Sequence, residues 1–175
     1  TEMEALRKRT SFQFPNFQDL ESYDYQDMIF RNADMDNIDF NVSGGNEKSN
    51  VYLGMGFLNQ YGILRGTSQK RLNIRLNSSY QVANWLEFGE NLAFTNNKIT
   101  GFDEWQYLNE YTSPIIGAIT VHPYLPPYDS TGNWVPRTVG NADSPLPSIE
   151  LLNKARNNYE GTGTFRVLIK PFKGF

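Results

Sequence analysis

The feature that most constrains this chain is an alternation of apolar and polar residues that recurs in several short stretches. In residues 71–82, RLNIRLNSSYQV, one parity carries leucine, isoleucine, tyrosine and valine, and the other carries arginine, asparagine and glutamine. The single interruption is Ser78. Because side chains of a β-strand point alternately to its two faces, this stretch predicts a strand with one apolar and one polar face.

Four further stretches show the same period of two, which predicts five strands in all. They are residues 37–43 in NIDFNVSG, 51–58 in NVYLGMGFL, 85–96 in WLEFGENLAFTN and 161–170 in GTGTFRVLIK. One charged residue breaks the pattern, since Glu90 falls on the apolar parity of its strand. Two explanations stay open: Glu90 lies near a membrane interface, or a bulge shifts the parity there.

The connections between these strands alternate between short and long. Residues 44–49, the stretch near Ala83 and Asn84, and PFKGF at 171–175 are tight turns, whereas 59–70 is longer and 97–160 is very long. Short turns at one end and long loops at the other are typical of an up-and-down barrel of the bacterial outer membrane, where the short turns are periplasmic. An alternative with the same alternation is a soluble carbohydrate-binding β-sandwich.

This topology gives each strand a direction. Residues 37–43, 71–82 and 161–170 are expected to run toward the periplasm, and 51–58 and 85–96 toward the exterior. An earlier outward strand is then expected within residues 10–34. Because the chain begins at Thr1 and its last residues directly follow a strand-like run, we expect a piece of a longer polypeptide with its targeting signal upstream.

Composition argues against several functional classes. A net charge of -3 without a long run of one sign gives no electrostatic surface for nucleic acid. The chain has no cysteine and one histidine, His122, so we expect no metal site and no cofactor. It has no G-x-S-x-G sequence, and we expect no enzyme. No apolar run reaches the length of a transmembrane helix.

An ordered series of motifs resembles one known family. It comprises SGG and a polar turn at 43–48, YGIL at 61–64, RLNIRLN at 71–77, and WL followed by GENL at 85–92. PYLPPYDSTGNW at 123–134 and SPLPSIELLNKARN at 144–157 continue the series in the long connection. From about residue 25 to its end, the chain resembles the start of the barrel in the SusC/RagA family of TonB-linked outer-membrane receptors.

The resemblance implies a non-enzymatic role in import. Members of this family have a plug inside a barrel of 22 strands, are energised by the TonB complex, and are capped by a SusD-like lipoprotein that captures glycans or peptides. The expected partners are therefore that lipoprotein, TonB, an oligosaccharide or oligopeptide, and outer-membrane lipid. These residues supply about a quarter of the strands and no plug, so they cannot close a barrel by themselves.

We divide the chain into four regions on this basis. Residues 1–36 form the connection from plug to barrel with a first strand, and 37–98 form barrel strands with short periplasmic turns. Residues 99–160 form a long extracellular loop, with helical turns at 103–120 capped by Asp103 and at 148–158 capped by Ser148. Residues 161–175 form a further strand and turn.

Two groups of residues are candidates for function. The polar parity of the strand at 71–82 is expected to face the lumen, because an arginine in lipid costs about 2 to 4 kcal/mol at mid-bilayer; this group is Arg71, Asn73, Arg75 and Asn77. Aromatic residues of the long loop are expected to contact cargo or the lid, or alternatively to pack the loop or mark the membrane interface. They are Trp105, Tyr107, Tyr111, Tyr124, Tyr128 and Trp134. Glycines 54 and 56 are expected to make room for a neighbouring backbone or a plug.

Overall fold

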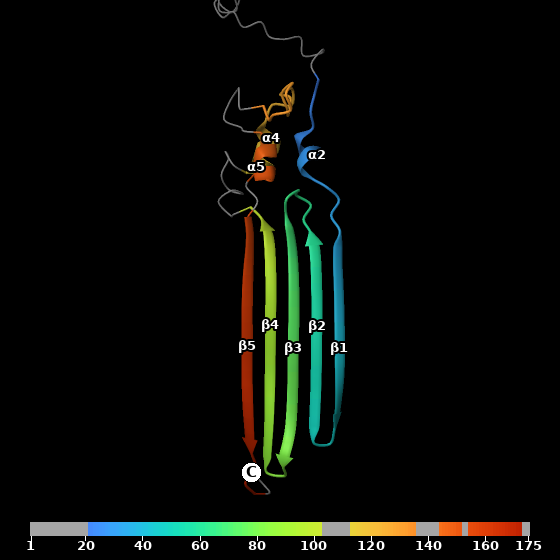
Figure 1. Ribbon diagram of the computed structural model, residues 1–175, viewed down its shortest axis with the longest axis vertical. Coiled ribbons are helices and arrows are strands. Elements are labelled where there is room, and N and C mark those ends of the chain that lie inside the picture. Colours follow the sequence, from blue (N-terminus) through green and yellow to red (C-terminus); the bar gives the residue numbers. More distant parts are fainter. Residues whose placement is uncertain (1–20, 103–112, 136–143, 152–153, 173–175) are drawn as a thin grey trace, which may run out of the picture.

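The main part of the molecule is one antiparallel sheet. A computed structural model describes residues 21–102, 113–135, 144–151 and 154–172. The strands are neighbours in chain order: β1 (Met35–Asn46), β2 (Ser49–Tyr61), β3 (Ser68–Ala83), β4 (Leu86–Gly101) and β5 (Lys154–Ile169). Figure 1 shows long strands side by side, with short helices beyond one end. The expected all-β, up-and-down antiparallel architecture is confirmed.

The two ends of the sheet differ as the connection lengths predict. Two-residue turns at 47–48 and 84–85 lie at one end, and the connection at 62–67, the end of β4 and the start of β5 lie at the other. At the first short turn, the Asn46 Oδ1 accepts hydrogen bonds from the backbone N–H groups of Lys48 (2.8 Å) and Ser49 (2.9 Å). This local bonding stabilises the turn between β1 and β2.

The register between β3 and β4 decides how Glu90 is placed. Ser68 pairs with Thr100, and the same offset continues without a break to the pair Gln81 and Glu87. The register shifts only between Gln81 and Ala83. No bulge therefore lies at Glu90, and the explanation of its position by a shifted parity is wrong.

The last strand begins earlier than its alternation predicts. β5 starts at Lys154, and its residues 154–160 pair with β4, where Lys154 lies opposite Gly101 and Asn158 opposite Asn97. The helix expected at 148–158 is instead α5 (Pro145–Leu151), which begins before Ser148. Pairing with β4 bonds the backbone groups of 154–158 that face that strand, and this tertiary effect outweighs a weak helical pattern.

Short helices form where capping side chains are available. In α2 (Tyr25–Ile29), the Asp24 side chain accepts hydrogen bonds from the N–H groups of Gln26 and Asp27. In α4 (Pro114–Thr120), Ser113 is the N-cap. The expected cap Asp103 lies outside the described residues. No helix in the described ranges is both long and apolar enough to span a membrane.

The segment before β1 differs from the expected outward strand. Of residues 10–34, the structure describes 21–34, which contain α2 and extended connections. Figure 1 places α2 beside α4 and α5, at the end of the sheet that carries the longer connections. The prediction of a strand is therefore wrong for residues 21–34, and residues 10–20 lie outside the described part.

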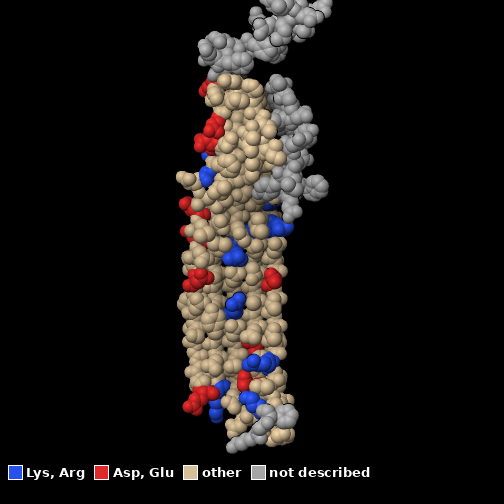
Figure 2. Space-filling model, turned by 180° about the vertical axis from the view of Figure 1, so that it is seen from behind, with Lys and Arg blue, Asp and Glu red and all other residues tan. Residues whose placement is uncertain are grey.

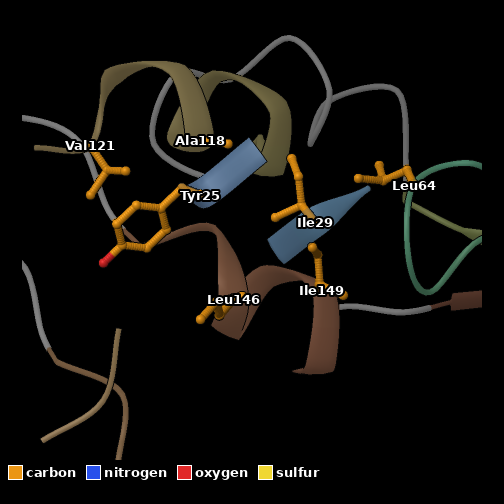
Figure 3. Close-up of a cluster of buried hydrophobic side chains, with 7 residues drawn as sticks. All are labelled: Tyr25, Ile29, Leu64, Ala118, Val121, Leu146 and Ile149. Carbon is orange, nitrogen blue, oxygen red and sulfur yellow. The ribbon is translucent and has the colours of Figure 1, made fainter. Parts of the chain in front are cut away.

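The three helices share a small apolar core (Figure 3). Its buried residues are Tyr25, Ile29, Leu64, Ala118, Val121, Leu146 and Ile149. Ile29 is 0% exposed, and the Tyr25 hydroxyl donates a 2.7 Å hydrogen bond to the Leu125 carbonyl. Burial raises the pKa of Tyr25, because the apolar surroundings disfavour the phenolate.

Arg31 ties this core to the connection between β2 and β3. Its Nε donates to the Gly62 carbonyl (3.1 Å) and its Nη2 to the Thr67 carbonyl (3.2 Å). Its guanidinium also lies over the Tyr61 ring, 5.3 Å from the centroid. The YGIL motif at 61–64 thus supplies a ring, a carbonyl and a buried leucine to one fixed turn.

Candidate functional site

The two faces of the sheet have opposite chemistry. Directly paired residues of an antiparallel sheet share a face. One such row is Val42, Leu53, Leu76 and Leu92, and the next row along the strands, on the other face, is Asn41, Gly54, Arg75 and Ala93. The alternation in the sequence therefore produces one apolar and one polar surface.

The apolar face is largely uncovered. In the described part of the chain, no helix packs against either face of the sheet. Exposed large side chains on this face include Ile38, Phe40, Met55, Phe57, Tyr80, Phe88, Phe94, Phe165 and Val167. Soluble monomers rarely expose a contiguous apolar area of this kind, which marks an interaction with lipid or protein.

Aromatic residues lie toward both margins of this apolar face. Tyr80 and Phe88 pair with one another near the short turns, and Trp85 lies in the turn itself. Tyr61 and Tyr159 lie near the end with the longer connections. In membrane barrels, the lipid-facing surface has an apolar band about 25 Å tall between two aromatic girdles.

The polar face carries charges of both signs. Figure 2 shows basic side chains along the middle of the sheet, with acidic side chains toward its edges. Near the short turns, Arg166 and Glu87 form an ion pair with an N–O distance of 3.2 Å. Such an exposed pair contributes little to stability. The face as a whole is suited to contact with water or with polar groups.

The upper part of the polar face contains a hollow of about 330 Å³, which we call the upper hollow. Its floor is formed by small residues of β2 and β4, and its sides by polar residues of β1 and β3. The polar-face residues that line it are Asp39, Asn41, Tyr52, Gly54, Gly56, Arg71, Asn73, Arg75, Ala93 and Thr95. It joins acid, amide and guanidinium groups in one open site.

A second hollow of about 450 Å³, the lower hollow, lies nearer the short turns. Its polar-face lining consists mainly of neutral hydrogen-bonding side chains: Ser43, Asn50, Tyr52, Asn77, Ser79, Asn91 and Arg166. Its charged lining residues are Arg166, which is already paired with Glu87, and Glu90 of the apolar parity. The upper hollow differs in that it contains two arginines without an ion pair among the described residues.

Tyr52 lines both hollows and explains the nearby glycines. Its hydroxyl donates a 2.7 Å hydrogen bond to the Asn41 Oδ1. A Cβ at Gly54 would stand 2.8 Å from that hydroxyl, and a Cβ at Gly56 would stand 2.6 Å from the Asp39 Oδ1. Within the described residues, these glycines make room for side chains of this same sheet.

The four residues expected to face a lumen all lie on the polar face. Arg71, Asn73 and Arg75 line the upper hollow, and Asn77 lines the lower one. Asp39 and Tyr52 were missed as site residues because each was considered only within its own strand. The polar parity of NIDFNV carries the signal for Asp39, but register is needed to place it across from Asn73.

Two aromatic residues of the long loop lie together within the described residues. Tyr128 and Trp134 pair in an isolated β-bridge, in which Trp134 packs against the helical core and Tyr128 is 44% exposed. Tyr124 lies beside His122, with ring centroids 5.3 Å apart. Trp105, Tyr107 and Tyr111 lie outside the described residues.

Asp129 organises the turn between Tyr128 and Trp134. Its Oδ1 accepts hydrogen bonds from the Thr131 hydroxyl (2.6 Å), the Thr131 N–H (2.8 Å) and the Asn133 N–H (3.0 Å). These bonds, led by that from the Thr131 hydroxyl, hold the pKa of Asp129 below its usual value. Gly132 has a φ of 85°, which glycine adopts without strain.

Among the described residues, no group of three or more histidine, acidic or cysteine side chains is arranged to hold a metal ion.

A comparison with protein-family models finds no match, and a comparison with curated proteins finds none either. Similar chains do exist among solved structures. The RagAB peptide transporter has a TM-score of 0.70 and 22% identity, over 88% of this chain and 18% of that chain.

This chain has the fold of part of RagAB. The RagAB peptide importer in its "closed-closed" state gives a TM-score of 0.68 and 20% identity, again over 88% of this chain and 18% of that one. The chain thus spans less than a fifth of the length of the RagAB chains that it matches. The likeness confirms the fold expected for a partial barrel, and RagAB itself is a peptide importer.

Proposed function

We propose that these strands form part of the wall of an outer-membrane transport barrel of the SusC/RagA kind, with the apolar face toward lipid and the polar face toward the lumen. The observation that carries the proposal is the separation of chemistry between the two faces. A barrel wall in a membrane requires an apolar exterior and a polar interior on alternating residues of every strand.

The free strand edges favour a larger barrel. β1 and β5 each pair on one side only within the described residues. In a membrane every backbone group must be paired, so an open five-stranded sheet cannot stand alone there. The fold match to a short part of the RagAB chains supports completion of the barrel by further strands.

The arginines of β3 favour the same orientation. Arg71 and Arg75 project from the polar face, where they line the upper hollow. Placing either side chain against lipid would cost about 2 to 4 kcal/mol at the bilayer midplane, and less near its surfaces. The reversed arrangement would also place the exposed apolar side chains in a hydrated lumen.

A soluble β-sandwich fits the described sheet less well. A sandwich requires a second sheet packed about 10 Å from the first on its apolar face. The described residues form a single five-stranded sheet, and none of their helices covers that face. The open apolar surface favours lipid over an internal core.

Cargo and partners follow from the proposed barrel. The chain acts, in this proposal, as a non-enzymatic component that imports glycans or peptides with a SusD-like capping lipoprotein and the TonB complex. The helical core at the loop end forms a fixed base for the lid, because α2 is bonded to the β2–β3 connection by the contact of Arg31 with Gly62 and Thr67.

Cysteine labelling on intact cells tests both location and orientation. Single cysteines would replace Ser130 in the loop and Glu47 in the short β1–β2 turn of the barrel polypeptide that contains these residues. A membrane-impermeant maleimide is expected to label Ser130→Cys on intact cells, and Glu47→Cys only after the outer membrane is opened.

A second measurement separates a barrel from a soluble protein. The barrel polypeptide should need detergent for extraction and should migrate differently on gels when unboiled. Labelling of Glu47→Cys but not Ser130→Cys on intact cells would reverse the orientation. Full solubility without detergent would refute the membrane location.

A further inference from the structure

The upper hollow contains two guanidinium groups that the sheet itself leaves without partners. Within the described residues, the side chains of Arg71 and Arg75 form neither an ion pair nor a hydrogen bond, and the Arg71 Nε is shielded from solvent. The arginine near the short turns behaves differently, since Arg166 is paired with Glu87 at 3.2 Å. Of the two hollows, only the upper one therefore contains arginine side chains without a partner among the described residues.

The residue between them adds a further donor. The Asn73 side-chain oxygen accepts a 3.1 Å hydrogen bond from the Thr95 hydroxyl. Its Nδ2 lies 3.8 Å from the place where a Cβ would stand on Gly56, above the floor of the hollow. Two guanidinium groups and one amide N–H₂ thus lie along one strand face, and all of them donate hydrogen bonds.

The opposite side of the hollow provides acceptors. The Asp39 Oδ1 lies 2.6 Å from the same Cβ position over Gly56, and its Oδ2 accepts a 2.7 Å hydrogen bond from Asn37. Because β1 and β3 flank β2, the donor and acceptor sides are about 10 Å apart at the backbone. The absence of a side chain at Gly56 lets the Asp39 carboxylate lie over the floor of the hollow, on the side that faces the Asn73 amide.

We propose that the upper hollow is a carboxylate subsite for oligopeptide cargo, in which Arg71 and Arg75 bind a carboxylate and Asp39 accepts backbone N–H groups. This rests on the proposed function as an importer. Guanidinium groups present a planar set of donors that matches a carboxylate in two-point geometry.

Peptide fits this arrangement better than a neutral glycan does. A peptide with acidic residues or a free carboxyl terminus offers an anion and, within a few ångströms, N–H donors for the opposite side. A neutral sugar offers hydroxyl groups only, so it would displace water from two guanidinium groups and one carboxylate without neutralising them. A carboxylate neutralises the guanidinium groups on binding.

Binding to the purified barrel polypeptide in detergent provides the primary test. The probes are a fluorescent heptapeptide with three glutamates and its counterpart with three glutamines. The unmodified protein is expected to bind the glutamate peptide at least about tenfold more tightly, since hydrogen bonds to charged groups are stronger than those to neutral amides.

Two variants sharpen the test. The double variant Arg71→Gln with Arg75→Gln should abolish this preference and change binding of the glutamine peptide less than about twofold. Arg156→Gln is the matched control, because Arg156 lies on the polar face of β5 but does not line the hollow. It should leave both affinities unchanged. Altered migration of unboiled samples would show that the glutamine variant misfolds. The variant Arg71→Lys with Arg75→Lys would then replace it, and its preference for the glutamate peptide should be reduced.

Several results would overturn the proposal. One is equal affinity of the unmodified protein for both peptides. Another is a preference that survives in the arginine variants, and a third is tight binding of an oligogalacturonate with no binding of either peptide. Failure of cells to import peptides that the purified protein still binds with this preference would instead contradict the proposed function and leave the subsite intact.

Discussion

The side-chain hydroxyl of Ser78 donates a 3.0 Å hydrogen bond to the Glu90 Oε1. Both residues interrupt the apolar parity of β3 and β4, and the register places them directly opposite one another. The neighbouring pairs are Leu76 with Leu92 and Tyr80 with Phe88. Two departures from the pattern thus form one polar pair on the apolar face, one row from the aromatic margin.

Substitution of Glu90 tests whether this face contacts lipid. We expect Glu90→Lys to destabilise the barrel, by up to about 2 to 4 kcal/mol if the site is near mid-bilayer and by less toward the interface. Glu90→Leu should preserve or increase stability, because it removes a polar group from an apolar surface. The measurement is the temperature at which the unboiled form converts on gels. Ser78→Ala is the matched control, and greater loss for Glu90→Leu than for Glu90→Lys would contradict lipid contact.

Removal of the Arg31 side chain should loosen the connection between β2 and β3. Arg31→Met loses the hydrogen bonds to the Gly62 and Thr67 carbonyls and the contact with the Tyr61 ring. We expect faster proteolysis at residues 62–67, with the strands still protected. Arg65→Met is the control, since Arg65 is exposed and bonds to Ile29 through its backbone N–H. Equal cleavage in both variants would show that Arg31 does not hold the connection.

Truncation of Ile29 should destabilise the helical core at the loop end. Ile29 is 0% exposed, and Ile→Ala in a packed core costs about 2 to 5 kcal/mol. Hydrogen exchange should accelerate in α2, α4 and α5 while the strands keep their protection. Ile119→Ala provides a control, because Ile119 is 65% exposed on α4. Loss of protection throughout β1–β5 would mean that the core and the sheet unfold as one unit.

The turn at residues 128–134 should depend on pH through Asp129. Hydrogen bonds to its carboxylate lower the pKa of Asp129, so the ionised form stabilises the folded turn. That contribution is complete above the ordinary pKa near 4 and is lost as the pH falls through the lowered value. Proteolysis of this turn with an acid-active protease should rise steeply with falling pH. Asp129→Ala should be susceptible at every pH, whereas Ser130→Ala should match the unmodified chain; pH-independent cleavage of the unmodified turn would exclude this role.

Local sequence determined much of this fold, because alternation acts within one strand. The apolar and polar parities of residues 71–82 fix which side chains share a face, and the alternating connection lengths fix an up-and-down order. The polar face of β3 was therefore predicted from sequence, with Arg71, Asn73, Arg75 and Asn77 on it.

Tertiary structure decided what depends on contacts between strands and between distant segments. Register alone brings Ser78 to Glu90, and Asp39 to the hollow that Arg71 and Arg75 line. The early start of β5 arises because pairing with β4 satisfies backbone groups that a helical pattern would bond locally. Helix α2 is held by apolar packing with α4 and α5. The hydrogen bond from Tyr25 to the Leu125 carbonyl joins residues 100 positions apart in the chain. Such contacts have no periodic signal in the sequence, since they join residues whose spacing the fold itself sets.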